Sequence, residues 1–190
     1  MSGVSTAIAM CTGPGGRIHV TGSAGTALYE ADGTLVWTAT ICGVDLVADA
    51  EGGTTVVGSS GTVAFAAAGA VVWSDPVPAL AVARDFDGRV MVLSAESLTW
   101  FGNAGERVRT RELPEINGWP VLGRLMKVDF GGRPVVVGTS KNDLFGTESL
   151  VVMRYDSAGN LDWVTSPDGF LNADRPGREH AYSLGDGFCR

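Results

Sequence analysis

Residues 56–75 read VVGSSGTVAFAAAGAVVWSD, and the pattern of this stretch decides the fold. Two valines lead into a glycine-containing turn, a second short apolar run ends at Phe65, and Gly69 then precedes Trp73. Glycine supplies the positive φ that tight hairpins need, whereas valine, threonine, phenylalanine and tryptophan fit a pleated, half-buried surface. The stretch therefore predicts short antiparallel strands that are joined by tight turns.

The same pattern occurs four times along the chain. Its turn glycines are separated by 36, 36 and then 54 residues, and they are Gly33, Gly69, Gly105 and Gly159. Four positions before them stand the aromatic residues Tyr29, Phe65, Phe101 and Tyr155, and four positions after them stand Trp37, Trp73, Arg109 and Trp163. A further glycine column, at Gly16, Gly53, Gly88 and Gly132, marks an earlier turn. Agreement of several columns across four copies is a much stronger signal than any single motif.

Each copy contains four short strands, so the repeat predicts an all-β protein of four-stranded antiparallel sheets. The units cover about residues 4–39, 43–75, 79–112 and 124–166, and residues 179–190 resemble the start of a further unit. In the second unit we expect strands at 44–48, 54–58, 62–66 and 70–74. One such sheet cannot bury both of its faces, whereas sheets stacked around an axis can. We therefore predict a single β-propeller domain over residues 1–190, with four blades and the start of a fifth.

The extra residues of the last interval fall at two predicted strand connections, within 112–123 and 141–148. The first insertion contains an Asn-Gly turn signal followed by Trp119, which lies outside the repeat columns. Because tryptophan is enriched at binding hot spots, Trp119 is the candidate for an exposed ligand contact. Packing of its loop onto the blade is the alternative that we favour. The column aromatics and tryptophans, by contrast, are expected to be mostly buried between neighbouring sheets.

Composition argues against several functional classes. The net charge of −7 repels phosphate backbones, so nucleic acid is not an expected partner. No apolar run reaches the roughly 20 residues that span a bilayer, and the first residues lack the features of a signal peptide. The basic stretch Arg107–Arg111 is interpreted as the solvated edge of a strand. The cysteines Cys11, Cys42 and Cys189 do not form a disulfide framework or zinc signature, although one disulfide remains an open alternative.

Few residues could carry chemistry. Aspartates recur in the first turn of the units, and they are Asp49, Asp85 with Asp87, Asp129 and Asp186. They could contribute to a calcium loop, but the six to eight spaced oxygen ligands are missing, and Asp before Gly is ordinary turn chemistry. His19 lies mid-strand and His180 follows Glu179, and neither belongs to a catalytic or zinc motif. We therefore expect turn-forming aspartates, no metal site and no catalytic residue.

The repeat also carries a family resemblance. Residues 54–75 and 22–38 resemble the repeat of quinoprotein-type (PQQ-like) β-propellers, and residues 148–163 are similar to bacterial propeller repeats of the SBBP and delta-60 type. Such repeats occur in enzymes, assembly factors and surface proteins alike, so the resemblance implies an architecture more than an activity. The quinoprotein enzymes combine the propeller with a disulfide between adjacent cysteines, a calcium site and a tryptophan floor for the quinone. This chain has no adjacent cysteines, so we expect no cofactor.

These observations favour a non-enzymatic bacterial scaffold that presents loops to a protein or carbohydrate partner, outside the cytoplasm or at the cell surface. A fragment of a quinoprotein-like oxidoreductase propeller is the alternative, and an assembly or adhesion protein is a third. Four units and one further strand do not form a tidy ring, and an open arc would expose the apolar faces of its terminal blades. Further blades or self-association with another copy would cover those faces. A distorted four-bladed ring with a loose tail is the remaining alternative.

Overall fold

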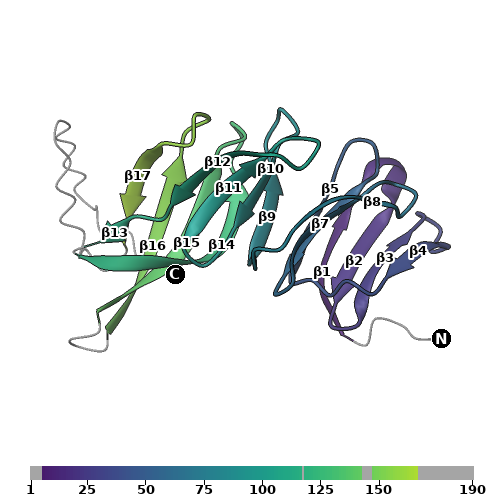
Figure 1. The fold of residues 1–190 in the computed structure, drawn as a ribbon, viewed down its shortest axis with the longest axis horizontal. Helices are drawn as coiled ribbons and strands as arrows, with labels where there is room; N and C mark the ends of the chain where they lie inside the picture. Colours follow the sequence, from purple (N-terminus) through teal and green to yellow (C-terminus); the bar gives the residue numbers. More distant parts are fainter. Residues whose placement is uncertain (1–5, 117, 143–146, 167–190) are drawn as a thin grey trace, which may run out of the picture.

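In the computed structural model, the described residues 6–116, 118–142 and 147–166 form four antiparallel sheets that stand side by side (Figure 1). The first sheet contains β1 (Ala7–Thr12), β2 (Ile18–Gly22), β3 (Gly25–Tyr29) and β4 (Leu35–Ala39), with the short 3-10 helix η1 (Pro14–Gly16) after β1. The second contains β5 (Asp45–Ala48), β6 (Thr54–Gly58), β7 (Gly61–Phe65) and β8 (Val71–Asp75). The third contains β9 (Ala81–Arg84), β10 (Val90–Leu93), β11 (Ser97–Phe101) and β12 (Arg107–Glu112). The fourth contains β13 (Glu115–Ile116), β14 (Trp119–Val128), β15 (Pro134–Asn142), β16 (Thr147–Tyr155) and β17 (Leu161–Thr165).

Each sheet is a meander in which strands adjacent in sequence are also adjacent in space. The strands β1, β5, β9 and β14 of successive sheets contact one another, so each of them is the innermost strand of its sheet. This is the arrangement of consecutive propeller blades, and it confirms the fold class predicted from the repeat. In the second sheet the observed strands lie within one residue of the predicted ones. No helix in the described part of the chain is long and apolar enough to cross a membrane.

The fourth sheet differs from the predicted four-stranded unit because it has a fifth strand, β13. Ile116 pairs with Trp119, so β13 and the beginning of β14 form a tight hairpin in which Gly118 has a φ of 80°. Lys141 also pairs with Glu148, which lengthens the hairpin of β15 and β16. The two insertions thus add paired backbone where the sequence indicated strand connections. Pairing satisfies N–H and C=O groups that a long irregular loop would leave to water.

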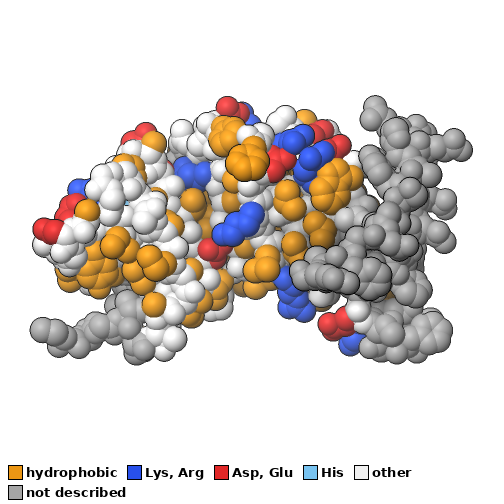
Figure 2. Space-filling view, turned by 180° about the vertical axis from the view of Figure 1, so that it is seen from behind, with side chains coloured by type: hydrophobic (Ala, Val, Ile, Leu, Met, Phe, Trp, Pro, Cys, Tyr) orange, Lys and Arg blue, Asp and Glu red, His pale blue; other side chains and the backbone are white. Residues whose placement is uncertain are grey.

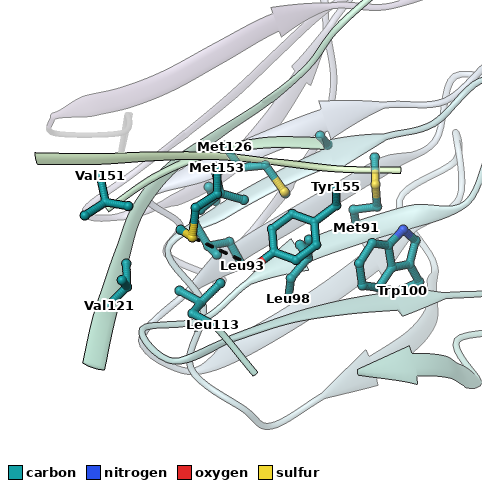
Figure 3. Close-up of a cluster of buried hydrophobic side chains, with 13 residues drawn as sticks. Met91, Leu93, Leu98, Trp100, Leu113, Val121, Met126, Val151, Met153 and Tyr155 are labelled. Atoms are coloured by element: carbon teal, nitrogen blue, oxygen red, sulfur yellow. Dashed lines mark hydrogen bonds between the residues drawn. The ribbon is translucent and has the colours of Figure 1, made fainter. Parts of the chain in front are cut away.

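The hydrophobic core lies between the sheets. The largest cluster joins the third sheet to the fourth (Figure 3), and its most buried large side chains are Met91, Leu93, Leu98, Trp100, Met126, Met153 and Tyr155. Burial raises the pKa of Tyr155 to about 12, so its phenol stays neutral. Smaller clusters around Phe101 and Phe65 join the second sheet to the third and the first sheet to the second. Each blade therefore depends on its neighbours for burial, as expected of a repeat protein.

Candidate functional site

The turns that follow the innermost strands gather at one end of the blades, and we call this end the turn face. Its turns are residues 13–17, 49–53, 85–89 and 129–133, and all four close with the same pair of backbone hydrogen bonds. In the third blade, for example, Asp85 N–H donates to Arg89 C=O, and Gly88 N–H donates to Asp85 C=O. Gly88 has a φ of 80°, whereas in the second blade Gly52 takes the positive φ instead of the column residue Gly53.

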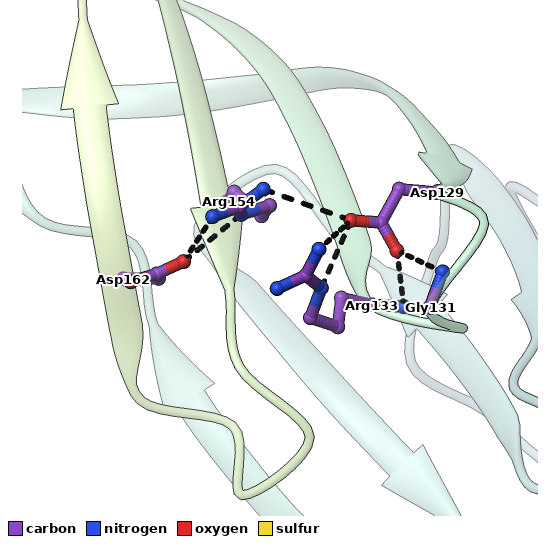
Figure 4. Close-up of polar contacts among 5 residues, drawn as sticks. All are labelled: Asp129, Gly131, Arg133, Arg154 and Asp162. Carbon is purple, nitrogen blue, oxygen red and sulfur yellow. Dashed lines mark hydrogen bonds and ion pairs between the residues drawn. The ribbon is translucent and has the colours of Figure 1, made fainter.

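The aspartates of these turns shape the backbone. Asp49 accepts a hydrogen bond from Gly53 N–H at 2.6 Å. Asp129 accepts from both the backbone and the side chain of Arg133, and these bonds lower the pKa of Asp129 to about 2 (Figure 4). Within the described residues, no three His, Cys, Asp or Glu side chains are grouped as metal ligands would be. Asp186 lies outside the described residues. The observed contacts of Asp49 and Asp129 are those of turn-forming side chains.

A groove of about 520 Å³ opens on the turn face between the second and third sheets. Both sheets supply its walls, which include Asp49, Phe65, Trp73, Arg84, Phe86 and Asp87. Trp73 of β8 stacks on Phe101 of β11 with ring centroids 5.2 Å apart, which holds the two walls together. The groove therefore results from the way two blades meet, and neither blade contains it alone.

Arg84 fixes one wall of this groove at the end of β9. Its Nη1 donates to Gly88 C=O at 2.7 Å, and its Nη2 lies 3.3 Å from Thr55 Oγ1 and 3.5 Å from Asp49 Oδ2. Burial lowers the pKa of Arg84 and the nearby Asp49 carboxylate raises it, but a guanidinium remains charged at neutral pH. Arg84 thus crosslinks the third blade to the second and has a fixed position beside the groove.

Two phenylalanines project from the turn face. Phe86, which lines the groove, is 74% exposed, and Phe130 in the equivalent turn of the fourth blade is 105% exposed. The Phe86 ring lies against the next turn, since a Cβ built on Gly132 would be 3.2 Å from it. Figure 2 shows hydrophobic side chains at the upper edge of the molecule beside acidic and basic ones. The turn face therefore combines projecting aromatic rings with fixed charges around a concave groove.

The residues of the repeat columns lie at the contacts between sheets. Phe65, Phe101 and Tyr155 are at most 3% exposed, whereas Tyr29 of the first sheet is half-buried. Trp37, Trp73 and Trp163 are also half-buried, which is less burial than expected. They lie on the outermost strand of their sheets, where solvent reaches one side of the ring. The turn glycines all have a φ between 71° and 86°, and they are Gly33, Gly69, Gly105 and Gly159.

Trp119 lies at the opposite end of its blade from the turn face. It is the first residue of β14, is half-buried, and its C=O accepts a hydrogen bond of 3.5 Å from Ser140 Oγ. The structure therefore places Trp119 in a paired strand, where the sequence indicated a loop. The described contacts of Trp119 include no other predicted site residue. Its role as a ligand contact stays a prediction.

His19 is fully buried at the contact between the first two sheets. Its Nδ1 lies 2.6 Å from Thr54 Oγ1, and burial lowers its pKa. It does not line the groove, and it links two blades. His180 and Cys189 lie outside the described residues. Cys11 and Cys42 are free thiols, and Cys42 is exposed.

The basic stretch of the third blade forms the exposed outer strand β12, as the sequence indicated, but its arginines also reach neighbouring groups. Arg107 donates two hydrogen bonds of 2.8 Å to the carboxylate of Asp75 in the second sheet. The Arg109 guanidinium lies 5.7 Å from the centroid of the Trp100 ring and donates to Ala158 C=O in the fourth sheet. The hydrogen bonds to Asp75 and Ala158 cross between blades, so β12 is more than a solvated edge.

Sequence reasoning found neither the groove nor the exposed phenylalanines. One signal was present: Phe86 and Phe130 each directly follow the turn aspartate, in a position that Ala50 takes in the second unit. The groove itself left no local signal, because its walls come from segments about 35 residues apart and depend on how the blades pack.

No protein-family model matches the sequence, and no curated protein matches it either. Solved structures share its fold, including the following two. Virginiamycin B lyase from Staphylococcus aureus aligns with a TM-score of 0.58 and 10% identity, over 87% of this chain and 70% of that chain. The extracellular domain of the hybrid two-component system BT3049 from B. thetaiotaomicron aligns with a TM-score of 0.55 and 10% identity, over 84% of this chain and 22% of that chain. At such identities the comparisons show the propeller fold alone.

Proposed function

We propose that this chain is a non-enzymatic propeller scaffold that binds an extended segment of a partner protein in the groove of its turn face. The position of Phe86 carries this proposal, because a largely exposed aromatic ring stands directly on the wall of a groove. Exposed aromatic side chains are typical anchors at protein interfaces. An extended segment would place apolar side chains on Phe86 and its own backbone groups along the polar walls.

The side chains of the groove suit recognition better than catalysis. Asp49 is occupied by the backbone of its turn, and Arg84 is held by Gly88 and Asp49. None of the described residues that line the groove is a serine, cysteine, histidine or lysine. The groove therefore offers fixed charges and aromatic surface, and its described lining residues include no hydroxyl, thiol, imidazole or amine that could act as a nucleophile.

The proposal includes a location outside the cytoplasm or at a bacterial cell surface. Two observations support it: the same fold occurs in the extracellular domain of a hybrid two-component system from B. thetaiotaomicron, and the repeats resemble PQQ-like and SBBP-type bacterial propellers. Detection of the native chain in a periplasmic or surface fraction of its own cells would test this part. Recovery only with cytoplasmic markers would contradict it.

The binding proposal is tested with two defined probes, a displayed library of linear peptides and a glycan array. Peptides selected on the native chain should bind Phe86→Ser at least tenfold more weakly, because a hot-spot aromatic typically contributes more than tenfold in affinity. The matched control is Val77→Ser, which changes a 42% exposed apolar side chain before β9 at the opposite end of the blades. If the selected peptides bind both variants equally, the groove is not their binding site and this part of the proposal is wrong. Glycan binding without any peptide selection would assign the scaffold to carbohydrate instead.

A further inference from the structure

The contact between the first and second blades is built from a tryptophan and a fitted surface. Trp37 of β4 packs on Phe65 with ring centroids 5.1 Å apart, and its Nε1 donates to Ala67 C=O at 3.2 Å. The Trp37 ring also covers Gly69, since a Cβ built there would be 2.7 Å from Trp37 Cγ. We call Trp37 the outer tryptophan of its blade, and Phe65, Ala67 and Gly69 the platform of the next blade.

The same contact recurs along the chain. Trp73 is the outer tryptophan of the second blade, and it stacks on Phe101 and covers Gly105 of the third blade. Between the third and fourth blades Arg109 takes the outer position, beside a Cβ built on Gly159. The outer tryptophan and the platform are therefore features of the repeat and not of one pair of blades.

Each terminal blade carries one half of this contact whose complementary half is not found in another blade among the described residues. The platform of the first blade is Tyr29, Ala31 and Gly33, each 36 residues before its counterpart in the second blade. A Cβ built on Gly33 would find nothing within 4 Å, whereas Gly69 and Gly105 are each covered by a tryptophan. Trp163 is the outer tryptophan of the fourth blade; it is half-buried, and the Arg154 guanidinium of its own sheet lies 5.4 Å from its ring centroid.

The surfaces around these two halves are apolar. Met10 of the first blade is 65% exposed, although its counterpart Leu46 is only 5% exposed because the first blade covers it. On the fourth blade, Leu125 is 64% exposed and pairs with Val137 on the face that carries Trp163. Hydrophobic side chains are visible at the surface at the left of Figure 2, the end of the molecule that contains the first two sheets. Both faces thus resemble the buried faces between the inner blades.

We propose that Trp163 of one copy docks on the Tyr29–Gly33 platform of a second copy, so that copies associate head to tail. Trp163 would stack on Tyr29, cover Gly33 and donate its Nε1–H to the Ala31 carbonyl, as Trp37 does to the platform of the second blade. A second copy is the occupant because this chain carries both complementary halves. The two surfaces are different, so each copy that is added presents a further platform or a further Trp163. Association therefore continues without limit unless the copies close into a ring.

The proposal is tested by filling the platform without disturbing the blade. Gly33→Asn introduces a side chain that tolerates the φ of 86° and that would occupy the space assigned to Trp163. Gly15→Asn is the matched control, because Gly15 has a φ of 69° and equally open surroundings in the same blade but lies outside the platform. In sedimentation experiments over a concentration series, the native chain and Gly15→Asn should associate. Gly33→Asn and Trp163→Ala should associate at least tenfold more weakly.

Mixing the two weakened variants distinguishes this interface from others. Gly33→Asn keeps its Trp163 and Trp163→Ala keeps its platform, so an equimolar mixture should form heterodimers that grow no further. Circular dichroism spectra and melting curves establish that each variant is folded. A native chain that stays monomeric at millimolar concentration overturns the proposal, whatever else covers Trp163. Association of Gly33→Asn that equals that of Gly15→Asn overturns it as well.

Discussion

Replacing Phe65 by alanine should destabilise the protein by about 3–5 kcal/mol. The side chain is 3% exposed and packs with Leu46, Val56 and Trp37 between the first two blades. Loss of a buried aromatic side chain removes about 1.5–3 kcal/mol of transfer free energy, and loss of its contact with Trp37 removes about 0.5–1.5 kcal/mol more. The cavity contributes the remainder, since two sheets fixed by their own hydrogen bonds cannot collapse into the space.

Urea unfolding followed by tryptophan fluorescence measures this effect. With a slope of about 2 kcal/mol per molar urea, a loss of about 4 kcal/mol lowers the unfolding midpoint by roughly 2 M. Phe130→Ala is the matched control, because the same substitution at a fully exposed site should change stability by less than about 0.5 kcal/mol. If Phe65→Ala shifts the midpoint no more than Phe130→Ala does, the aromatic column does not support the contact between blades and this reasoning is wrong.

Two further predictions concern acid stability and cofactor chemistry. Burial lowers the pKa of His19 below its ordinary value of 6.5, so the unfolded chain binds more protons, and the free energy of unfolding should fall as the pH drops below about 6.5. Urea midpoints measured from pH 7 to pH 5 should show this decrease for the native chain and not for His19→Gln, whereas Asp129 contributes only at lower pH, where its own pKa of about 2 is approached. Added pyrroloquinoline quinone and calcium should produce neither dehydrogenase activity nor a bound-cofactor spectrum, because the sequence has no adjacent cysteines; a stoichiometric spectrum would contradict this.

The blades could be predicted from the sequence because their signals are local. A tight turn needs a glycine at one defined position, and Gly69 has a positive φ in the position that the spacing indicates. The groove and the exposed phenylalanines of the turn face could not be predicted in the same way. Phe86 faces solvent and Phe65 faces a neighbouring blade, although both are phenylalanines at strand ends or turns. The spacing of the aromatic column predicts the burial of Phe65, whereas Phe86 lies outside that column, and its exposure depends on how one sheet packs against another.

The third blade shows how the repeat tolerates a departure from its own pattern. Arg109 stands where the other blades have a tryptophan, and the sequence alone indicated only a charged, solvated strand. In the structure the Arg109 guanidinium lies over the ring of Trp100, and that ring meets Tyr155 edge-on at 6.5 Å, so an aromatic group still reaches the fourth blade. The arrangement at Trp163 is different, because the cation beside its ring, Arg154, is held by Asp162 and Asp129 on the same sheet (Figure 4). A contact made by Trp163 should therefore follow the geometry of Trp37 and Trp73, with the ring itself against a glycine, and not that of the third blade.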